Sequence, residues 1–491
     1  MRKAGLTKAK SSSQKDRQLE LTCARIQRKA EKLNAEWRSL STCFLPVVND
    51  DPAWRYSRAA KAGDAAQGWK LHLSATILNA GTILKKVAPF LISCDIQFKA
   101  PASLQLLLQL NSGVSFGYPQ VGKFITVYPR TNDEAVRLAA HLHKLTDGMR
   151  APAVPFDLQY CRKSCVYYRY GAFSYEEIEN SDGRKIPAIR DQTGKLVPDL
   201  RDKACPDWAD NPFRGVSEPE ISQEESKENP LKSTYRIFRA LKQRGKGGVY
   251  QAIDVGTIPP RICVVKEGRA FGESYWDGCD GFQMIKGEAK ILKKIESLGI
   301  NVPRFYSSFE LDGNYYLVTE FVEGQSLDEM MMPRKRRFSI RQIFKYARQI
   351  AELLAQIHDA GWVWRDCKPA NLIITKKGLL RPLDFEGACL INQPTAFNWR
   401  TAGFSASENK SFLPTRASEA EDIYSLGTVV FYLLTGKIYQ PDSSSVRALR
   451  RNVPAAAEDL LDKILVLPLR EKRPSARSLV DEFDRLSNFI K

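Results

Sequence analysis

Two short segments near residue 370 carry side chains that could support phosphoryl transfer. The first, WRDCKPANLIIT, contains Asp366, Lys368 and Asn371, and the second, RPLDFEGA, contains Asp384. Phosphoryl transfer requires a carboxylate near the attacking hydroxyl, oxygen ligands for the metal ions, and a cation on the phosphates. These four side chains supply each of those groups, so the C-terminal half of the chain is a candidate phosphotransferase.

The order and spacing of these residues resemble the protein kinase family, in which D-x-K-x-x-N precedes a metal-binding aspartate. The resemblance implies that Asp366 is the catalytic base and that Lys368 steadies the transferred phosphate. It also implies that Asn371 and Asp384 hold Mg²⁺ and that ATP is the phosphoryl donor.

Upstream segments supply the other parts of an ATP site on the same resemblance. The strand-like ICVVKEG ends in Lys266, which would contact the α- and β-phosphates, and Glu288 in KGEAKILKKIESL can pair with it. In the glycine-rich segment LKQRGKGGVYQA, the ATP-binding residues would be Gly245, Gly247 and Val249. Three further residues match positions with structural roles in kinases: Glu408, Asp422 and Arg473.

The kinase-like segments depart from the family pattern at several positions. Trp364 stands where the family usually has histidine, and Glu386 stands where it has the glycine of the metal-binding triad. The first two family glycines of the phosphate loop fall on Lys242 and Arg244. Glu386 restricts the backbone and adds negative charge beside the metal site, so a pseudokinase is an alternative. All charged catalytic positions are present, which favours an active enzyme.

A second set of side chains, far upstream, could eliminate a phosphate from serine or threonine. β-Elimination needs a base with a pKa near the working pH, an acid for the leaving oxygen, and cations for the phosphate. Clustered cations lower the pKa of a lysine because each disfavours another nearby charge. Strand-like segments GWKLHLSAT, FKAP, GKFITVYP and YRYGAF contain the candidates: Lys70, His72, Lys99, Lys123 and Arg169.

These four segments, in this order, resemble the N-terminal lyase domain of class III and class IV lanthipeptide synthetases. That domain is similar to the phosphothreonine lyases of bacterial effectors. The resemblance implies that Lys99 is the general base and His72 the general acid. It further implies that the phosphate is held by Lys70, Lys123 and Arg169. For one more family arginine, Arg130 and Arg162 are the candidates in this sequence.

Each of these residues, considered alone, could have an ordinary structural or solvent-exposed role. A lysine at the end of a strand is usually a solvated charge, and one histidine is usually structural. Lys70 and His72 lie two residues apart, so both point to one face of the expected strand. Their position upstream of a kinase, with three further motifs in order, favours catalysis.

The elements that would position these residues divide the chain into four parts. Residues 1–45 contain a basic arm, expected to be disordered over 1–17, and an amphipathic helix whose apolar side chains recur every three or four residues. This helix docks on its own domain, or alternatively forms a coiled coil or binds a peptide. Residues 46–213 form a lyase-like domain, with strands at 96–98, 123–129 and 166–171 and helices at 79–94 and 132–148. Residues 214–230 are an acidic linker.

Residues 231–491 form the kinase-like domain, with an N-lobe at about 231–323 and a C-lobe at about 324–491. The expected fold class is α+β: a mixed α/β phospho-Ser/Thr lyase-like domain followed by a bilobal protein-kinase-like domain.

The net charge, the lengths of the apolar runs and the cysteine content indicate which kinds of partner and which cellular compartment to expect. The 491 residues carry a net charge of +18, which indicates an anionic partner, but no nucleic-acid motif accompanies it. No apolar run approaches the roughly 20 residues of a membrane-spanning helix, and no secretory signal follows the basic N-terminus. Ten scattered cysteines indicate reduced thiols, so a cytoplasmic location is expected.

The two activities together predict a bifunctional peptide dehydratase. The kinase would phosphorylate serine and threonine of a precursor peptide, and the lyase would convert them to dehydroalanine and dehydrobutyrine. No zinc-site cyclase is expected on this chain, so ring closure with the peptide's cysteines would need a separate cyclase or spontaneous addition. The alternatives are a Ser/Thr protein kinase whose first domain only binds phosphopeptides, a lyase with a pseudokinase scaffold, and a basic nucleic-acid-binding protein. The sequence does not determine the oligomeric state.

Overall fold

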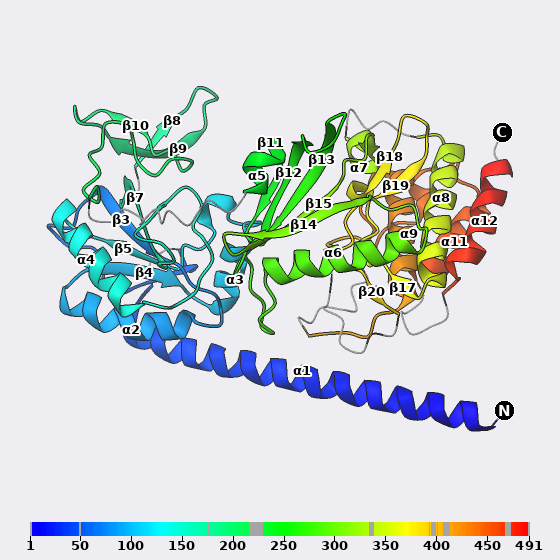
Figure 1. Ribbon diagram of the computed structural model, residues 1–491, viewed down its shortest axis with the longest axis horizontal. Coiled ribbons are helices and arrows are strands. Elements are labelled where there is room, and N and C mark those ends of the chain that lie inside the picture. Colours follow the sequence, from blue (N-terminus) through cyan, green and yellow to red (C-terminus); the bar gives the residue numbers. More distant parts are fainter. Residues whose placement is uncertain are drawn as a thin grey trace.

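The computed structural model describes residues 2–48, 51–174, 176–215, 229–332, 338–391, 393, 399, 401–405, 413–466 and 473–489. It contains a mixed α/β N-terminal domain followed by a kinase domain with a β-sheet lobe and a helical lobe (Figure 1). The predicted mixed α and β fold class is confirmed. Most of the predicted acidic linker, and Glu408, lie outside the described residues.

One long helix, α1 (Arg2–Phe44), extends along both domains and is drawn in blue in Figure 1, with the N-terminus at its far end. The prediction of a disordered arm over residues 1–17 is wrong, because helix-favouring lysine, alanine and glutamine continue the helix from Arg2 and no proline interrupts it. Ile26, Ala30 and Trp37 are buried against the N-terminal domain. The predicted amphipathic helix therefore docks on its own domain.

Seven antiparallel strands form the sheet of the N-terminal domain, in the order β1-β2-β4-β5-β3-β7-β6. The strands are β1 (Val47–Val48), β2 (Trp54–Tyr56), β3 (Gln67–Leu73), β4 (Gln97–Pro101), β5 (Ile125–Tyr128), β6 (Leu158–Gln159) and β7 (Val166–Ala172). The helical elements are α2 (Ala80–Ser93), α3 (Leu104–Ser112), the short η1 (Tyr118–Gln120) and α4 (Asn132–Leu145). The strands and helices predicted in this domain are all present, with shifts of one to three residues at their ends.

Strand β3 separates the core of this domain from its polar face. Trp69, Leu71 and Leu73 are buried in the apolar core together with α2 and α4. Lys70 and His72 alternate with them and therefore point to the opposite face. On that face Lys70 lies directly opposite Arg169 of β7.

A small three-stranded sheet, not predicted from the sequence, covers the polar face. It consists of β8 (Glu177–Glu179), β9 (Lys185–Arg190) and β10 (Leu196–Pro198), in the order β10-β9-β8. In Figure 1 it stands above the larger sheet. Gln67 of β3 ties the two sheets together, because its amide accepts from the backbone N–H of Arg190 and donates to the carbonyl oxygen of the same residue.

The β-sheet lobe of the kinase domain has five antiparallel strands in the order β11-β12-β13-β15-β14. Its elements are α5 (Pro230–Ser233), β11 (Tyr235–Arg244), β12 (Gly247–Asp254), β13 (Arg261–Gly268), α6 (Gly281–Ser297), β14 (Phe305–Leu311) and β15 (Asn314–Glu320). Helix α6 packs on β13 and β15 through Ile285 and Ala289. This packing presents Glu288 to the sheet.

The helical lobe surrounds one large apolar core. Its helices are α7 (Leu327–Met331), α8 (Ile340–Asp359), η4 (Pro369–Asn371), α9 (Glu419–Thr435), α10 (Val446–Leu449), α11 (Ala455–Leu465) and α12 (Ala476–Phe489). Short strands β16 (Gln325–Ser326), β17 (Trp362–Val363), β18 (Leu372–Ile374), β19 (Leu380–Pro382) and β20 (Cys389–Leu390) carry the catalytic loops. Asp366 and Asn371 lie between β17 and β18, and Asp384 follows β19.

The two domains share a packed interface. The backbone N–H of Gly245, at the tip of the β11–β12 hairpin, donates to the carbonyl oxygen of Ser112 at the end of α3, with an N–O distance of 2.9 Å. Trp276, in the segment before α6, is buried in the core of the N-terminal domain. Farther along, Asp16 of α1 pairs with Arg416 of the kinase domain at 3.0 Å.

Two sequence expectations concern the chain as a whole. All ten cysteines are free thiols, as expected. In the described part of the chain, every helix is too short or too polar to span a bilayer.

Candidate active sites

Five predicted lyase residues line one pocket on the polar face of the seven-stranded sheet, with a cavity volume of about 390 Å³. The register explains their meeting: His72 of β3 and Lys99 of β4 both lie opposite Thr126 of β5, between them. Lys123 precedes β5, and Lys70 and Arg169 lie opposite each other on the far side of the pocket. The structure therefore brings together Lys70, His72, Lys99, Lys123 and Arg169.

The lysines of this pocket have lowered pKa values. Burial, with a contribution from Arg201, lowers the pKa of Lys99 to about 8, although Asp51 opposes the shift. Burial and the Arg169 guanidinium lower the pKa of Lys70 to about 7. Lys99 also lies 4.4 Å from the centre of the Trp54 ring. About a tenth of Lys99 is thus a neutral amine at pH 7, which is the form that can accept a proton.

His72 is held by a carboxylate that the sequence did not reveal. Its Nδ1 lies 2.5 Å from Oδ2 of Asp157, and Nζ of Lys123 lies 3.1 Å from Oδ1 of the same residue. Burial alone would raise the pKa of Asp157, but His72, Lys123 and Arg169 hold it at about 2. Burial lowers the pKa of His72 to about 3, so the imidazole is neutral and Nδ1–H donates to Asp157. Asp157 lies in an irregular loop without periodicity, so no sequence pattern marks it.

Arg169 is positioned by the segment after the small sheet. Its Nη2 donates to Oδ1 of Asp199 at 2.8 Å and to the carbonyl oxygen of Leu200 at 2.9 Å. Its Nε is buried, and none of the described residues forms a hydrogen bond with it. A buried, unpaired guanidinium N–H in a cationic pocket is suited to an anion such as phosphate.

The additional arginine of this pocket is Arg201, and neither predicted candidate occupies that place. Arg201 lines the pocket from the segment after β10. Arg130 forms an ion pair with Glu134 on α4, and Arg162 lines a different cavity. The sequence did not identify Arg201 because the small sheet that places it there was not predicted.

The predicted catalytic loop of the kinase domain forms a closed hydrogen-bonded cluster. Lys368 Nζ and Asn371 Nδ2 donate to the Asp366 carboxylate at 2.8 and 2.7 Å. The hydroxyl of Thr401 also donates to Asp366, at 2.8 Å. Thr401 is a further candidate residue that no sequence pattern singled out, because it lies about 35 residues beyond the loop.

Lys266 forms ion pairs with one carboxylate from each lobe of the kinase domain, Glu288 from the β-sheet lobe and Asp384 from the helical lobe. Its Nζ lies 2.6 Å from Oε1 of Glu288 and 3.3 Å from Oδ1 of Asp384. Burial alone would raise the pKa of Asp384, but lysines 266, 246 and 368 hold it below its ordinary value. Asp384 is therefore ionised, as a ligand of Mg²⁺ must be.

Trp364, which stands where the kinase family usually has histidine, contacts two residues of the metal-binding triad. Its indole Nε1–H donates to the carbonyl oxygen of Asp384 at 2.7 Å, and its ring stacks on Phe385. Asp422, at the start of α9, accepts from the backbone N–H groups of Trp364 and Arg365 at 2.8 and 2.6 Å. The catalytic loop is thus anchored to the core of the helical lobe.

The glycine-rich segment is shaped by close backbone contacts. A Cβ on Gly245 would lie 1.6 Å from the carbonyl oxygen of Asn111, and one on Gly247, whose φ is +158°, would lie 1.7 Å from that of Glu267. Both positions therefore exclude a larger residue. Val249 lies opposite Lys266 in the sheet, so its strand does border the lysine expected to contact ATP.

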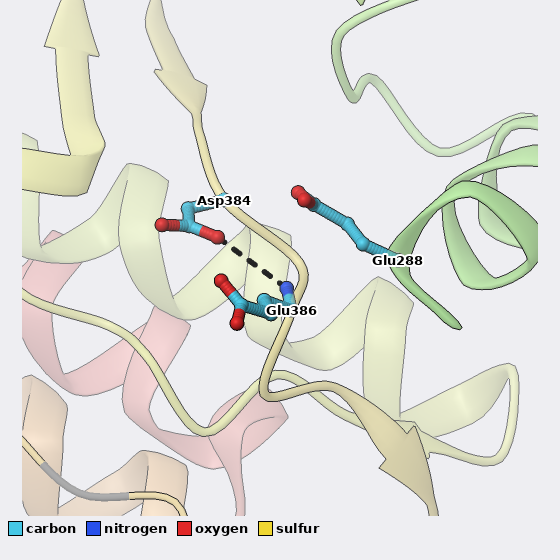
Figure 2. Close-up of side chains that lie close together, drawn as sticks. All are labelled: Glu288, Asp384 and Glu386. Atoms are coloured by element: carbon cyan, nitrogen blue, oxygen red, sulfur yellow. Dashed lines mark hydrogen bonds between the residues drawn. The ribbon is translucent and has the colours of Figure 1, made fainter. Parts of the chain in front are cut away.

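Glu386, the unusual member of the metal-binding triad, is almost fully buried and forms an ion pair. Its side chain is 3% exposed, and Oε2 lies 2.5 Å from Nζ of Lys246 at the hairpin tip. Figure 2 shows the carboxylates of Glu288, Asp384 and Glu386 converging, with ligand atoms within 4.8 Å of one another. Within the described part of the chain, Oε2 of Glu288 and Oε1 of Glu386 are buried without a hydrogen-bond partner. Hard, unpaired carboxylate oxygens fit Mg²⁺.

Comparisons with known proteins bear on both domains. Residues 47–226 match the family model "RamC, N-terminal domain", and residues 243–485 match "Protein kinase domain". Over 400 residues, the chain is 29% identical to the "Probable SapB synthase" of Streptomyces coelicolor, which covers 78% of this chain and 41% of that protein.

Two kinases of Synechocystis resemble the second domain. Serine/threonine-protein kinase F is 27% identical, over 51% of this chain and 54% of its own length. Serine/threonine-protein kinase B is 30% identical, over 52% of this chain and 47% of its own length. The chain therefore spans about half or less of the length of these curated relatives. The resemblance noted from the motifs is confirmed at the level of both domains: this chain carries a RamC-type N-terminal domain followed by a protein kinase domain.

Proposed function

We propose that the protein is a bifunctional peptide dehydratase of lanthipeptide-type biosynthesis. In this proposal the kinase domain phosphorylates serine and threonine of a precursor peptide with ATP and Mg²⁺, and the N-terminal domain eliminates the phosphate. The observation that carries the proposal is the pocket in which five lyase-type residues meet, on the same chain as a complete kinase catalytic cluster. The likeness to a SapB synthase supports a peptide substrate.

In the first step, the Asp366 carboxylate accepts the proton of the substrate hydroxyl as its oxygen attacks the γ-phosphorus. Lys368 and Thr401 hold Asp366 in place, and Lys266 is set by Glu288 to contact the α- and β-phosphates. Asn371 and Asp384 would hold Mg²⁺, which supplies charge neutralisation on the phosphates. The products are ADP and a phosphorylated serine or threonine.

In the second step, the neutral amine of Lys99 removes the α-proton of the phosphorylated residue. The electrons of that C–H bond form the Cα–Cβ double bond, and the Cβ–O bond breaks. Lys70, Lys123 and Arg169 hold the departing phosphate. His72 donates a proton to the leaving oxygen. The phosphate dianion, once bound, raises the pKa of His72 and so favours the charged form it needs. Dehydroalanine or dehydrobutyrine and inorganic phosphate result.

The alternatives differ in which domain is active. A pseudokinase scaffold fits poorly with the intact Lys266–Glu288 pair and the hydrogen-bonded Asp366 cluster. A domain that only binds phosphopeptides would have no need of the His72–Asp157 pair, in which a carboxylate orients an imidazole beside the cations of the pocket. Both observations favour two active sites.

The substrate in this proposal is a ribosomal peptide with serine, threonine and cysteine, processed in the cytoplasm. Ring closure by the cysteines would follow, through a cyclase or spontaneous addition of thiol to the dehydro residues. The proposal involves neither nucleic acid nor a membrane.

Two variants test the proposal on a Ser/Thr-containing precursor peptide with ATP and Mg²⁺, followed by mass spectrometry. Lys99→Met is expected to convert a product lacking one water per site into a product carrying one phosphate per site. Asp384→Asn is expected to abolish both products. Dehydration by the Asp384→Asn variant would contradict the kinase step, and continued dehydration by Lys99→Met would contradict the assignment of the base.

A further inference from the structure

The ion pair between Lys246 and Glu386 joins two parts of the kinase site that a glycine in the triad would leave unconnected. Lys246 is at the tip of the β11–β12 hairpin, where the expected phosphate-binding loop lies, and Glu386 is two residues after Asp384. Only one oxygen of Glu386 is used in this pair. Its other oxygen, Oε1, is buried and has no hydrogen-bond partner among the residues that the structure describes.

The position of that unpaired oxygen indicates a ligand. Figure 2 shows the Glu386 carboxylate turned toward Asp384, with Glu288 facing both from α6. A buried polar atom without a partner destabilises the fold, the more so when it is charged, so such an atom in a closed cluster usually has a role. The ion pairs with Lys246 and Lys266 each use a single oxygen of Glu386 and of Glu288, so Oε1 of Glu386 keeps no partner among the described residues. Hydrogen bonding within the cluster does not satisfy it, whereas a divalent cation would.

We propose that Asp384 and Glu386 together bind a divalent cation, with Glu386 supplying a ligand oxygen that glycine cannot provide and Glu288 as the third facing carboxylate. This site is additional to the Asp384–Asn371 pair that the kinase resemblance implies. In the absence of nucleotide, Lys246 holds Glu386 in place through their ion pair. When ATP binds, the Lys246 ammonium can leave Glu386 and contact the phosphates. The inference rests on the proposed kinase function for its purpose, but its binding step can be measured with neither ATP nor peptide.

The test uses the full chain and Mn²⁺ as the probe, without nucleotide, with free Mn²⁺ followed by electron paramagnetic resonance. The wild type is expected to bind Mn²⁺ in competition with Mg²⁺. Glu386→Gln and Glu386→Gly are each expected to weaken binding by roughly tenfold or more, since even the loss of a ligand's hydrogen-bond partner has an effect of that size. Lys246→Met is expected to tighten binding, because it removes the competing ammonium.

Glu273→Gln is the matched control, because Glu273 contributes negative charge near Lys246 but is outside the three-carboxylate cluster. It is expected to bind Mn²⁺ as the wild type does. Unchanged Mn²⁺ affinity in both Glu386 variants, each folded by circular dichroism, would overturn the site. Weaker binding in Lys246→Met would also contradict it, because Lys246 would then be needed for the cation rather than compete with it.

The same preparations distinguish this inference from the proposed function. If the peptide is phosphorylated while the Glu386 variants bind Mn²⁺ normally, the cation site fails and the kinase function stands. If Mn²⁺ binding depends on Glu386 while no peptide is phosphorylated, the cation site stands and the kinase function fails.

Discussion

Asp157 Oδ2 lies 2.5 Å from Nδ1 of His72, which lines the same pocket as Lys70 and Lys123. The carboxylate fixes which imidazole nitrogen carries the proton in the free protein, and so leaves Nε2 for the substrate. It also offsets the repulsion that Lys70 and Lys123 exert on a protonated ring. The proposed acid therefore depends on a residue from a loop that carries none of the sequence motifs.

Asp157→Asn is expected to slow elimination by about a hundredfold, the lower end of what a general acid contributes. Phosphorylated peptide should accumulate in place of dehydrated peptide, because the kinase site is untouched. The ratio of the two products by mass spectrometry measures this effect. Asp182→Asn, in the exposed β8–β9 turn, is the control and should behave as the wild type. Equal elimination rates in the wild type and Asp157→Asn would show that the carboxylate does not position the acid.

Elimination is expected to depend on pH through Lys99. The amine accepts a proton only when it is neutral, and it is neutral above its pKa of about 8. Because His72 must be charged to donate its proton, the rate should rise and then fall with pH in a bell-shaped profile. Single-turnover release of phosphate from a synthetic phosphopeptide, without ATP, isolates this step. A rate that falls steadily as the pH rises would exclude a neutral lysine as the base.

Thr401→Val is expected to reduce phosphorylation by roughly tenfold to a hundredfold, because a hydrogen bond to a charged group contributes about 1.5–3 kcal/mol. Thr401→Ser retains the hydroxyl that donates to Asp366 and should retain activity. Elimination from a phosphopeptide supplied in solution should be equal in both variants. If the Thr401→Val and Thr401→Ser variants reduce the phosphorylation rate equally, the Thr401 hydroxyl has no role in the reaction.

Gly245→Ala tests the contact between the hairpin tip and the N-terminal domain. An added Cβ would lie 1.6 Å from the Asn111 carbonyl oxygen, so the tip must move away from α3. Lower thermal stability and slower phosphorylation are expected. The control is Gly287→Ala in α6, where no atom lies within 4 Å of an added Cβ and alanine favours the helix. Equal melting temperatures for the wild type and Gly245→Ala would show that the tip contact does not hold the domains together.

Trp37→Ala tests the docking of α1. The Trp37 side chain is 2% exposed and packs on Phe124, so its removal should cost about 3–5 kcal/mol of unfolding free energy. Leu21→Ala, at a position 61% exposed on the same helix, should change it by less than about 0.5 kcal/mol. Denaturant unfolding measures both. A small effect at Trp37 would mean that α1 is not part of the folded core.

The motifs predicted which side chains meet in the two candidate sites, because these side chains occur at fixed spacing on strands and in one loop. Alternation in β3 was enough to place Lys70 and His72 on one face, and the D-x-K-x-x-N spacing was enough to bring Lys368 and Asn371 to Asp366. Local periodicity carries this kind of information. The same periodicity predicted the docked face of α1.

The residues that complete the sites could not be predicted, because tertiary packing alone brings them there. Asp199 and Arg201 reach the pocket from the irregular segment after β10, and Asp157 contacts His72 from another loop. The small sheet that orders Asp199 and Arg201 consists of short strands between polar turns. The pairing of Lys246 with Glu386 joins residues 140 positions apart. Two substitutions that looked like defects, Trp364 and Glu386, have partners in the folded structure that no single-sequence pattern indicates.

The central claim is that the N-terminal domain eliminates phosphate from a phosphorylated side chain. The most direct measurement supplies the full chain with a synthetic peptide carrying phosphoserine or phosphothreonine, without ATP, and follows inorganic phosphate and peptide mass. The account predicts release of phosphate together with dehydroalanine or dehydrobutyrine, and neither product with Lys99→Met. A phosphopeptide that binds to the wild-type protein but remains intact would contradict it.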